Sequence, residues 1–166
     1  HVEFLRSDSS PATPESGVLY AADHSEAARL AVAAGQRILL TIGVNNVGPY
    51  AEAARVGGRD LVVRVLPRDE SSAACRAAGL RDDQIITSRG APAVDENVAV
   101  IRKYGVNVLV TKDSGDAGGV REKIEAARQT GCVVVLVRRP SMETAQCART
   151  VPALIERVRQ AMSVLK

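Results

Sequence analysis

The sequence predicts an α/β domain with a doubly wound parallel sheet of about five strands and helices on both faces, of the Rossmann-like or flavodoxin-like type. Apolar, β-branched runs alternate with helix-forming segments along most of the chain, and the connections between them are short. The runs at residues 38–40, 106–110 and 132–137 are apolar with little interruption, which is typical of central strands buried on both faces.

The chain is expected to begin with an irregular segment and then to enter the sheet. Residues 1–16 are predicted to be a loop or the remnant of an inter-domain connection, because Ser, Pro and Asp are frequent in residues 7–16. Residues 17–22 are predicted to form a short strand. The segment from Asp23 to Glu26 has the spacing of a capping box, and the helix that it starts is expected to end at Gly35.

The same unit of strand, turn and helix repeats from residue 36 onward, with Pro at helix starts and Gly at helix ends. Further strands are predicted over residues 38–41, 60–66, 84–87, 106–110 and 132–137, with a short edge strand at 146–148. Further helices are predicted over residues 49–56, 70–78, 92–104, 120–130 and about 151–164. Residues 17–166 are therefore expected to form a single α/β domain.

Composition narrows the class of function. The net charge of +3 comes from 22 basic and 19 acidic residues spread along the chain, and three Tyr with one Phe make a poor stacking surface, so nucleic acid is not an expected partner. No stretch approaches the ~18 apolar residues of a membrane span. The three cysteines, which lack metal-binding spacing, are expected to be buried free thiols of a cytoplasmic protein with no metal site; they are Cys75, Cys132 and Cys147.

The most informative segment is residues 108–119, where an apolar run leads into a polar, glycine-rich turn before a helix. Helix-start amides lack internal partners, so such turns bind anions, and Lys112 and Ser114 add a cation and a hydroxyl. Gly, Ser and Asp also gather at such turns for capping reasons alone. Ligands of doubly wound sheets bind beyond the carboxyl ends of the strands. That rule adds five residues to the candidate ligand contacts, namely Thr41, Gly43, Arg89, Arg138 and Arg139.

The sequence lacks the motifs that several classes of nucleotide-binding protein and enzyme require. The chain contains no G-x-x-x-x-G-K-[ST], no G-x-G-x-x-G and no G-x-S-x-G, and the histidines are His1 and His24, of which His24 is predicted to be structural or solvated. A phosphoacceptor receiver domain needs an acidic pair after its first strand, where this chain has residues 42–45, Ile-Gly-Val-Asn. Asp113 is a weak candidate for an acid or base. A cofactor is therefore expected to carry the chemistry.

The motifs resemble the carboxy-terminal portion of the precorrin-6A reductase family, including the cobalt-precorrin-6A reductases. The matching residues are Leu40-Thr41-Ile42-Gly43, Ser88-Arg89-Gly90 with Glu96, Val110-Thr111-Lys112-Asp113-Ser114-Gly115 with Gly118-Gly119, Lys123 and Ala126-Ala127, and Arg139-Pro140. The chain departs from the family pattern at Val44, where the family usually has Arg, and at Asp8-Ser9, where the family often has R-P-x-W.

The resemblance implies a reductase of corrin ring biosynthesis that transfers hydride from NADPH or NADH to a double bond of a carboxylate-rich tetrapyrrole. It also implies that an amino-terminal domain, with half of the cleft, is missing here. Cofactor contacts are expected from Thr41, Gly43, Lys112, Ser114, Gly115, Gly118 and Gly119, and substrate contacts from Arg89, Arg138 and Arg139. The alternative is an isolated, non-catalytic domain that binds an anionic tetrapyrrole or a nucleotide.

Overall fold

The computed structural model describes residues 17–114, 118–139, 152, 155–156 and 159. The chain divides into two units, of which Thr13–Pro140 contains the sheet and His1–Ala12 with Ser141–Lys166 forms the other. In the second unit, residues 152, 155, 156 and 159 are helical, within the helix predicted at 151–164. The predicted loop at 1–16 and edge strand at 146–148 lie outside the described residues, and the single domain over 17–166 stays a prediction.

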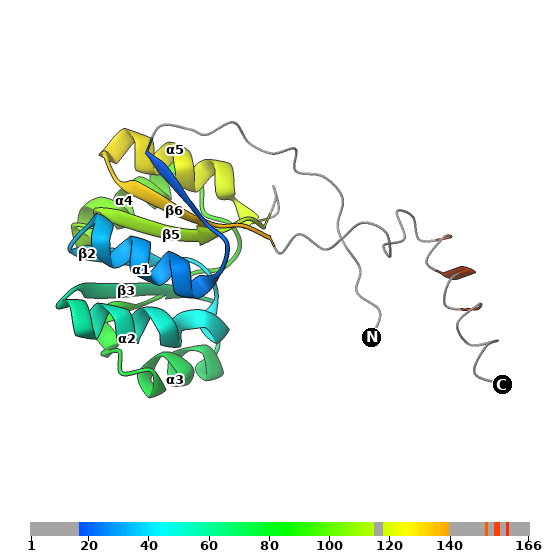
Figure 1. Cartoon of the computed structure of the whole chain (residues 1–166), viewed down its shortest axis with the longest axis horizontal. Helices are drawn as coiled ribbons and strands as arrows, with labels where there is room; N and C mark the ends of the chain where they lie inside the picture. The colour runs from blue at the N-terminus through cyan, green and yellow to red at the C-terminus, as the bar shows by residue number, and fades with distance from the viewer. Residues whose placement is uncertain (1–16, 115–117, 140–151, 153–154, 157–158, 160–166) are drawn as a thin grey trace. The chain divides into compact units, whose positions relative to one another are not determined.

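Six parallel strands form one sheet in the order β1-β6-β5-β2-β3-β4, so the predicted parallel sheet is confirmed with one strand more than the expected five (Figure 1). The strands are β1 Val18–Ala21, β2 Arg37–Leu40, β3 Asp60–Val65, β4 Ile85–Thr87, β5 Val108–Lys112 and β6 Val133–Val137. The three runs predicted to be central are β2, β5 and β6, and each has a neighbour on both sides.

Helices cover both faces of the sheet, as predicted. The first three pack together with one face, and α4 and α5 pack on the other. The helices are α1 His24–Ala34, α2 Val47–Gly57, α3 Asp69–Ala77, α4 Val94–Tyr104 and α5 Val120–Thr130, with short 3₁₀ turns η1 Val44–Asn46 and η2 Asp82–Gln84. In the described part of the chain, no helix has the length and apolar character needed to cross a bilayer.

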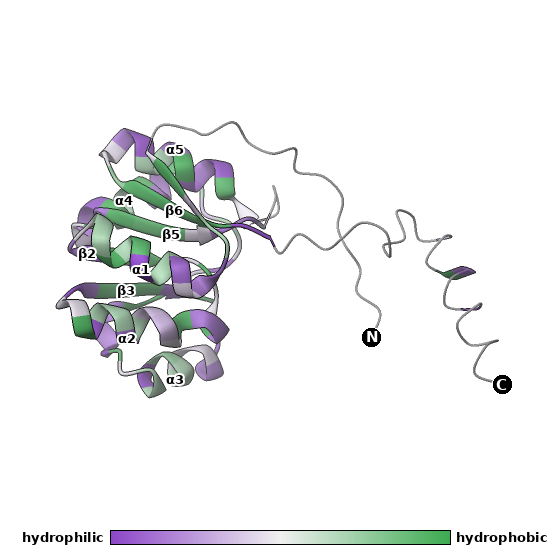
Figure 2. Ribbon diagram, in the orientation of Figure 1, coloured by the Kyte–Doolittle hydropathy of each residue, from purple (hydrophilic) through white to green (hydrophobic). Residues whose placement is uncertain are grey.

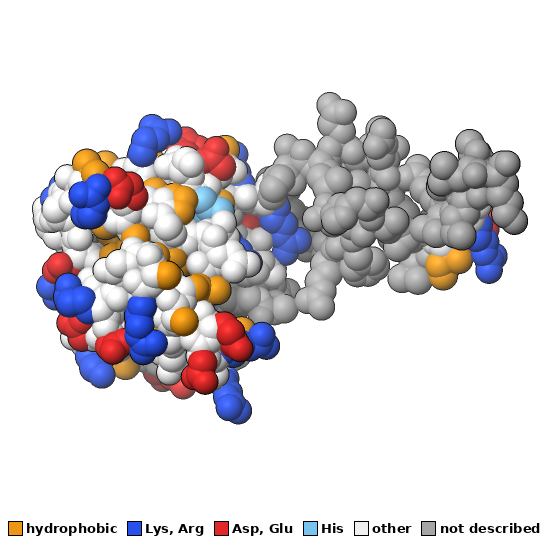
Figure 3. Space-filling model, turned by 90° about the horizontal axis from the view of Figure 1, so that it is seen from below, with side chains coloured by type: hydrophobic (Ala, Val, Ile, Leu, Met, Phe, Trp, Pro, Cys, Tyr) orange, Lys and Arg blue, Asp and Glu red, His pale blue; other side chains and the backbone are white. Residues whose placement is uncertain are grey.

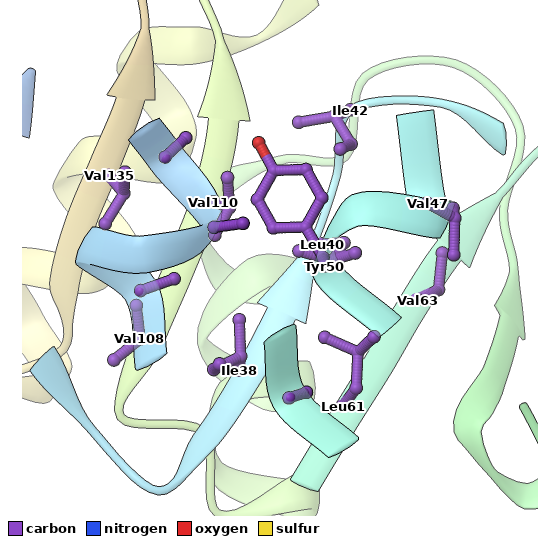
Figure 4. Packing of buried hydrophobic residues seen from close by; sticks show 14 of the residues in the cluster. Ile38, Leu40, Ile42, Val47, Tyr50, Leu61, Val63, Val108, Val110 and Val135 are labelled. Atoms are coloured by element: carbon purple, nitrogen blue, oxygen red, sulfur yellow. The ribbon is translucent and has the colours of Figure 1, made fainter. Parts of the chain in front are cut away.

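The core is aliphatic, as the composition indicates. On the α1 face, Tyr50 from α2 is 1% exposed and its ring lies among Leu40, Ile42 and Val110 (Figure 4). The hydrophobic colouring along the strands gives way to hydrophilic residues at the carboxyl end of β6 (Figure 2). The polar groups that can bind a ligand are therefore concentrated beyond the strand ends.

Local signals explain most element boundaries. The Asp23 side chain accepts a hydrogen bond from the Glu26 amide at 2.8 Å and begins α1 as the capping-box spacing predicts. Helix α2 begins at Val47, two residues before Pro49, because η1 leads directly into it. Strand β5 begins at Val108, later than predicted, because the Val106 amide closes the end of α4 by donating to the Ile101 carbonyl at 2.9 Å.

Candidate functional site

The carboxyl ends of β1, β6 and β5 lie side by side, and the chain leaves β1 and β5 in different directions. Strand β1 continues into α1 on one face, whereas β5 continues toward α5 on the other. Backbone hydrogen bonds extend this edge beyond the strands, from the Arg138 amide to the Ala21 carbonyl and from the Asp113 amide to the Val137 carbonyl, both at 2.9 Å. Ligands of doubly wound sheets bind beyond the carboxyl ends of the strands, as at this edge, and the adjacent strands whose connections diverge to opposite faces are β5 and β2.

A pocket of about 300 Å³ opens at this edge. It is lined by His24, Lys112, Asp113, Ser114, Val137, Arg138 and Arg139. Among the residues that the structure describes, no carboxylate forms an ion pair with Lys112 or Arg138. On the face seen in Figure 3, basic and acidic side chains are intermixed. The pocket is therefore a local excess of positive charge, suited to an oxyanion.

The two arginines of the pocket are oriented before any ligand arrives. The Arg138 guanidinium lies over the Tyr20 ring, with its carbon 4.8 Å from the ring centroid. The Arg139 Nε donates a hydrogen bond to the Asp113 carbonyl at 2.8 Å. Because these contacts restrict the rotamers, less conformational entropy is lost when a ligand binds.

His24 is a pocket residue that the sequence reasoning assigned to a structural or solvated role. Its Nδ1 shares a hydrogen bond with the Tyr50 hydroxyl at 2.9 Å, so Nε2 is the ring nitrogen left for a ligand. Burial and the charge of Lys112 lower the pKa of His24, and Asp23 partly opposes them. The imidazole is therefore neutral at pH 7. The signal for this residue was its position as the first helical residue after a strand.

The structure brings together five of the residues predicted from the sequence, Lys112, Asp113, Ser114, Arg138 and Arg139. Thr41 does not line the pocket: its amide and its Oγ1 both donate to the Val110 carbonyl at 2.9 Å, which joins β2 to β5. Gly43, with φ +88°, follows β2 and does not line the pocket either. Gly115 lies outside the described residues.

The other predicted residues lie toward the α4 and α5 face. Arg89 follows β4 at the edge of the sheet, outside the pocket. Ala91, two residues after Arg89, packs against the start of α5. A Cβ on Gly119 there would lie 2.8 Å from the Ala91 Cβ. Gly118 packs against the Ser114 side chain. The glycine-rich turn thus touches the pocket through Ser114 and the interior through Gly118 and Gly119.

A buried polar cluster lies beneath that turn, and the sequence reasoning did not find it. Arg64 is 8% exposed and its Nη1 donates to the Asn97 Oδ1 at 2.9 Å, while its Nη2 has no hydrogen-bond partner among the residues that the structure describes. The Asn97 amide nitrogen donates to the Pro92 and Ala93 carbonyls. Burial lowers the pKa of Arg64, and Glu96 partly opposes it. The sequence feature that could have indicated this cluster is an arginine within the apolar run of β3.

We expect Gly118→Ala to destabilise the domain by about 1–3 kcal/mol, the usual effect of overpacking. The new Cβ would overlap the Ser114 side chain, so the turn must shift. Urea unfolding measures the change. Gly48→Ala is the matched control, because nothing lies within 4 Å of a Cβ there, and it should be neutral or slightly stabilising. If Ser114→Gly did not reduce the effect of Gly118→Ala, steric overlap would not be its cause.

Comparison with known proteins connects this site to a family. Residues 1–162 match the family model described as precorrin-6x reductase CbiJ/CobK. The chain is 34% identical over 121 residues to the cobalt-precorrin-6A reductase of Priestia megaterium, covering 72% of this chain and 48% of that protein. It is 32% identical over 129 residues to the cobalt-precorrin-6A reductase of Methanothermobacter thermautotrophicus, covering 76% of this chain and 42% of that protein. The chain thus spans about half the length of these curated relatives.

A solved structure has the same fold. The protein titled CobK precorrin-6A reductase aligns with a TM-score of 0.62 at 19% sequence identity, covering 91% of this chain and 57% of that one. The resemblance seen in the sequence motifs is confirmed by the match over residues 1–162. The chain belongs to the precorrin-6x reductase CbiJ/CobK family.

Proposed function

We propose that this chain forms the carboxy-terminal half of a reductase of cobalamin biosynthesis, which uses NADPH or NADH to reduce one double bond of precorrin-6A or cobalt-precorrin-6A. An amino-terminal domain completes the cleft. The observation that supports this proposal most strongly is the pocket at the ends of β5 and β6, where Lys112, Arg138 and Arg139 gather around about 300 Å³. Both the phosphates of the cofactor and the carboxylates of the tetrapyrrole are oxyanions that such a pocket attracts. The free, buried thiols Cys75 and Cys132 suit the cytoplasm.

The residues present fit part of a nicotinamide dinucleotide. The pocket volume is at the lower end of the roughly 300–1,000 Å³ of small-molecule sites, so it accommodates one portion of a dinucleotide or one edge of a macrocycle. Lys112 and Arg138 have no described carboxylate to neutralise them, which leaves their charge available to a phosphate. The remaining contacts fall to the amino-terminal domain.

The chemistry divides between cofactor and protein. A bound nicotinamide supplies the hydride, and the protein binds and orients the reactants. Arg138 and Arg139, held by Tyr20 and by the Asp113 carbonyl, fix an anionic group in place. Neutral His24 offers Nε2 at the same pocket as a hydrogen-bonding group without added charge.

Titration calorimetry with NADPH and with NADH, followed by an NADPH-oxidation assay with precorrin-6A and cobalt-precorrin-6A, tests the proposal. We expect wild-type chain to bind one of the dinucleotides, and Lys112→Met to weaken that binding about tenfold, the value of one charge-assisted hydrogen bond. Lys103→Met removes an equal charge from the far end of α4 and should bind as wild type does. Equal affinity in all three proteins would reject Lys112 as a cofactor contact.

The second candidate function is a non-catalytic binding domain. The chain covers 48% of the Priestia megaterium protein, and its pocket holds only part of a dinucleotide. Dinucleotide binding without oxidation, which persists when the amino-terminal half of a relative is added, would favour this candidate. Oxidation that appears on that addition would favour the reductase.

A further inference from the structure

Tyr50 on α2 connects the aliphatic core to the pocket through His24. Its side chain is 1% exposed, and its ring lies in the aliphatic cluster of Figure 4. Its hydroxyl oxygen lies 2.9 Å from Nδ1 of His24, which lines the pocket. The two rings meet edge to face, with centroids 5.9 Å apart and an interplanar angle of 76°. The tyrosine therefore contacts the imidazole from the side of the core and does not line the pocket itself.

Burial decides which partner of this hydrogen bond donates. Either the Tyr50 O–H donates to Nδ1 of His24, or an Nδ1–H donates to the hydroxyl oxygen. In the second arrangement the phenolic proton is left without an acceptor, because Nδ1 is the hydrogen-bond partner that the described residues offer this hydroxyl. A buried donor without an acceptor is costly. The Tyr50 hydroxyl therefore donates, and the neutral imidazole carries its proton on Nε2.

The same hydrogen bond favours the neutral form of His24. Protonation would place hydrogens on both ring nitrogens, so Nδ1 could no longer accept from Tyr50. Burial raises the pKa of Tyr50, so the hydroxyl keeps the proton that it donates. In the described part of the chain, Nε2 of His24 has no hydrogen-bond partner. His24 therefore presents an uncharged N–H donor to a ligand of the pocket.

The charges around His24 act in the same direction. Burial and the Lys112 ammonium on β5 lower the pKa of His24, and Asp23 before α1 partly opposes them. Three further charged side chains line the same pocket, namely Asp113, Arg138 and Arg139. An imidazolium would add another positive charge to these cations. A neutral donor instead adds a hydrogen bond to the bound anion without more repulsion between the groups that bind it.

We propose that His24 donates a hydrogen bond from Nε2 to an oxygen of the anion in the pocket, and that Tyr50 is the positioning residue that fixes this tautomer. This inference rests on the proposed function of the pocket. The ligand chemistry is an oxyanion, which accepts hydrogen bonds, and either a dinucleotide phosphate or a tetrapyrrole carboxylate supplies it. Because Tyr50 is buried and offers no path to solvent, the pair serves binding and not proton transfer.

Ligand binding tests the donor. Affinities of the wild type, His24→Leu and His24→Gln for NADPH, NADH and the octacarboxylate uroporphyrin are measured by calorimetry at pH 7. We expect His24→Leu to weaken the ligand that it contacts about tenfold. His24→Gln, whose amide is a neutral donor, should recover most of that loss. A loss with uroporphyrin identifies a carboxylate, a loss with both dinucleotides their diphosphate, and a loss with NADPH alone its 2′-phosphate. If His24→Leu binds all three ligands as the wild type does, or if His24→Gln recovers nothing, His24 is not a donor to the ligand.

Nitrogen NMR of the histidine rings tests Tyr50 without any ligand. The chain contains two histidines, so His24→Gln identifies the signals of His24. In the wild type at pH 7 we expect Nε2 to be the protonated nitrogen and Nδ1 the acceptor. Tyr50→Phe, which keeps the ring and removes the hydroxyl, should populate both tautomers and raise the pKa of His24 toward its ordinary value. Tyr104→Phe, which removes a hydroxyl at the last residue of α4, should change neither.

The two measurements separate this proposal from the proposed function. If no ligand binds to the wild type, the proposed function fails, while the NMR spectra still support or reject the tautomer. If Nδ1 carries the proton in the wild type, or if Tyr50→Phe leaves the titration of His24 unchanged, the positioning role of Tyr50 is wrong. Should Tyr50→Phe not fold, the wild-type spectrum decides.

Discussion

Replacing Asn97 with leucine is expected to destabilise the domain by about 3 kcal/mol, the usual scale when a buried charge loses its partner. Asn97 is 1% exposed, and its Oδ1 accepts the hydrogen bond from Arg64 Nη1 at 2.9 Å. Because Nη2 has no hydrogen-bond partner in the described part of the chain, the substitution leaves the buried guanidinium without a described acceptor. Leucine has the same number of side-chain heavy atoms but a larger volume, so no cavity forms and some overpacking adds to the effect. Urea unfolding at pH 7 measures the change.

A double-mutant cycle with Arg64→Met separates the charge from the packing. In the Arg64→Met background no guanidinium remains to be stranded, so Asn97→Leu should cost only about 1 kcal/mol, from the hydrogen bonds to the Pro92 and Ala93 carbonyls. Additive effects of the two substitutions would contradict this account, since they would show that Asn97 contributes independently of Arg64.

The fold could be predicted from the sequence because the apolar patterns and the residues at helix ends indicate the same elements. Helix α5 was predicted at 120–130 and is observed over the same residues, since Gly119 precedes its first residue and Gly131 follows its last. Strand β1, which brings the number of strands to six, was harder to assign to the sheet. Residues 18–21 form β1 at the edge of the sheet, and only Ala21 of these is buried, so their pattern could not show whether the segment joined the sheet. Pairing with β6 through Val18 and Val134 decides it.

Only part of the candidate site could be predicted from the sequence, because hydrophobic periodicity indicates which segments are strands but not their order in the sheet. The rule of strand carboxyl ends found Lys112, Ser114 and Arg138, which do share a pocket. It could not show that β1 lies beside β6, the arrangement that places His24 in the same pocket. Thr41, whose Oγ1 bonds to the Val110 carbonyl and so joins β2 to β5, lies outside this pocket, and its predicted contact with a ligand stays a prediction.

Two further residues broke local rules and could have been recognised. Arg64 lies between Val63 and Val65 in a strand with neighbours on both sides, and Lys123 lies on the helix face that carries Ala126 and Ala127. Places where a charge interrupts an apolar pattern are those where function most often overrides folding rules. Their proximity depends on the β5-β2-β3 order, so only the structure shows that they form one cluster.

The stability of Lys123→Met relative to the wild type is expected to depend on pH. In the folded chain the pKa of Lys123 is about 8, against 10.5 ordinarily. This difference corresponds to roughly 3 kcal/mol against the charged form, of which the lost hydrogen bond from Nζ to the Gly118 carbonyl offsets about 1 kcal/mol. The methionine variant should therefore be more stable than the wild type by about 2 kcal/mol at pH 7. A buried, unpaired cation replaced by an apolar side chain commonly has this effect.

The advantage of the variant should shrink between pH 8 and 10.5. In that range the folded wild type holds Lys123 neutral while the unfolded chain still binds its proton, so wild-type stability gains with rising pH. Urea unfolding of both proteins at pH 7, 8, 9 and 10, under reducing conditions, measures the difference. The buried thiols Cys75 and Cys132, whose pKa values are raised by burial, affect both proteins equally and cancel. A difference that stays constant over this range would mean that Lys123 does not titrate there, and that burial together with repulsion by Arg64 and Lys112 does not lower its pKa to about 8.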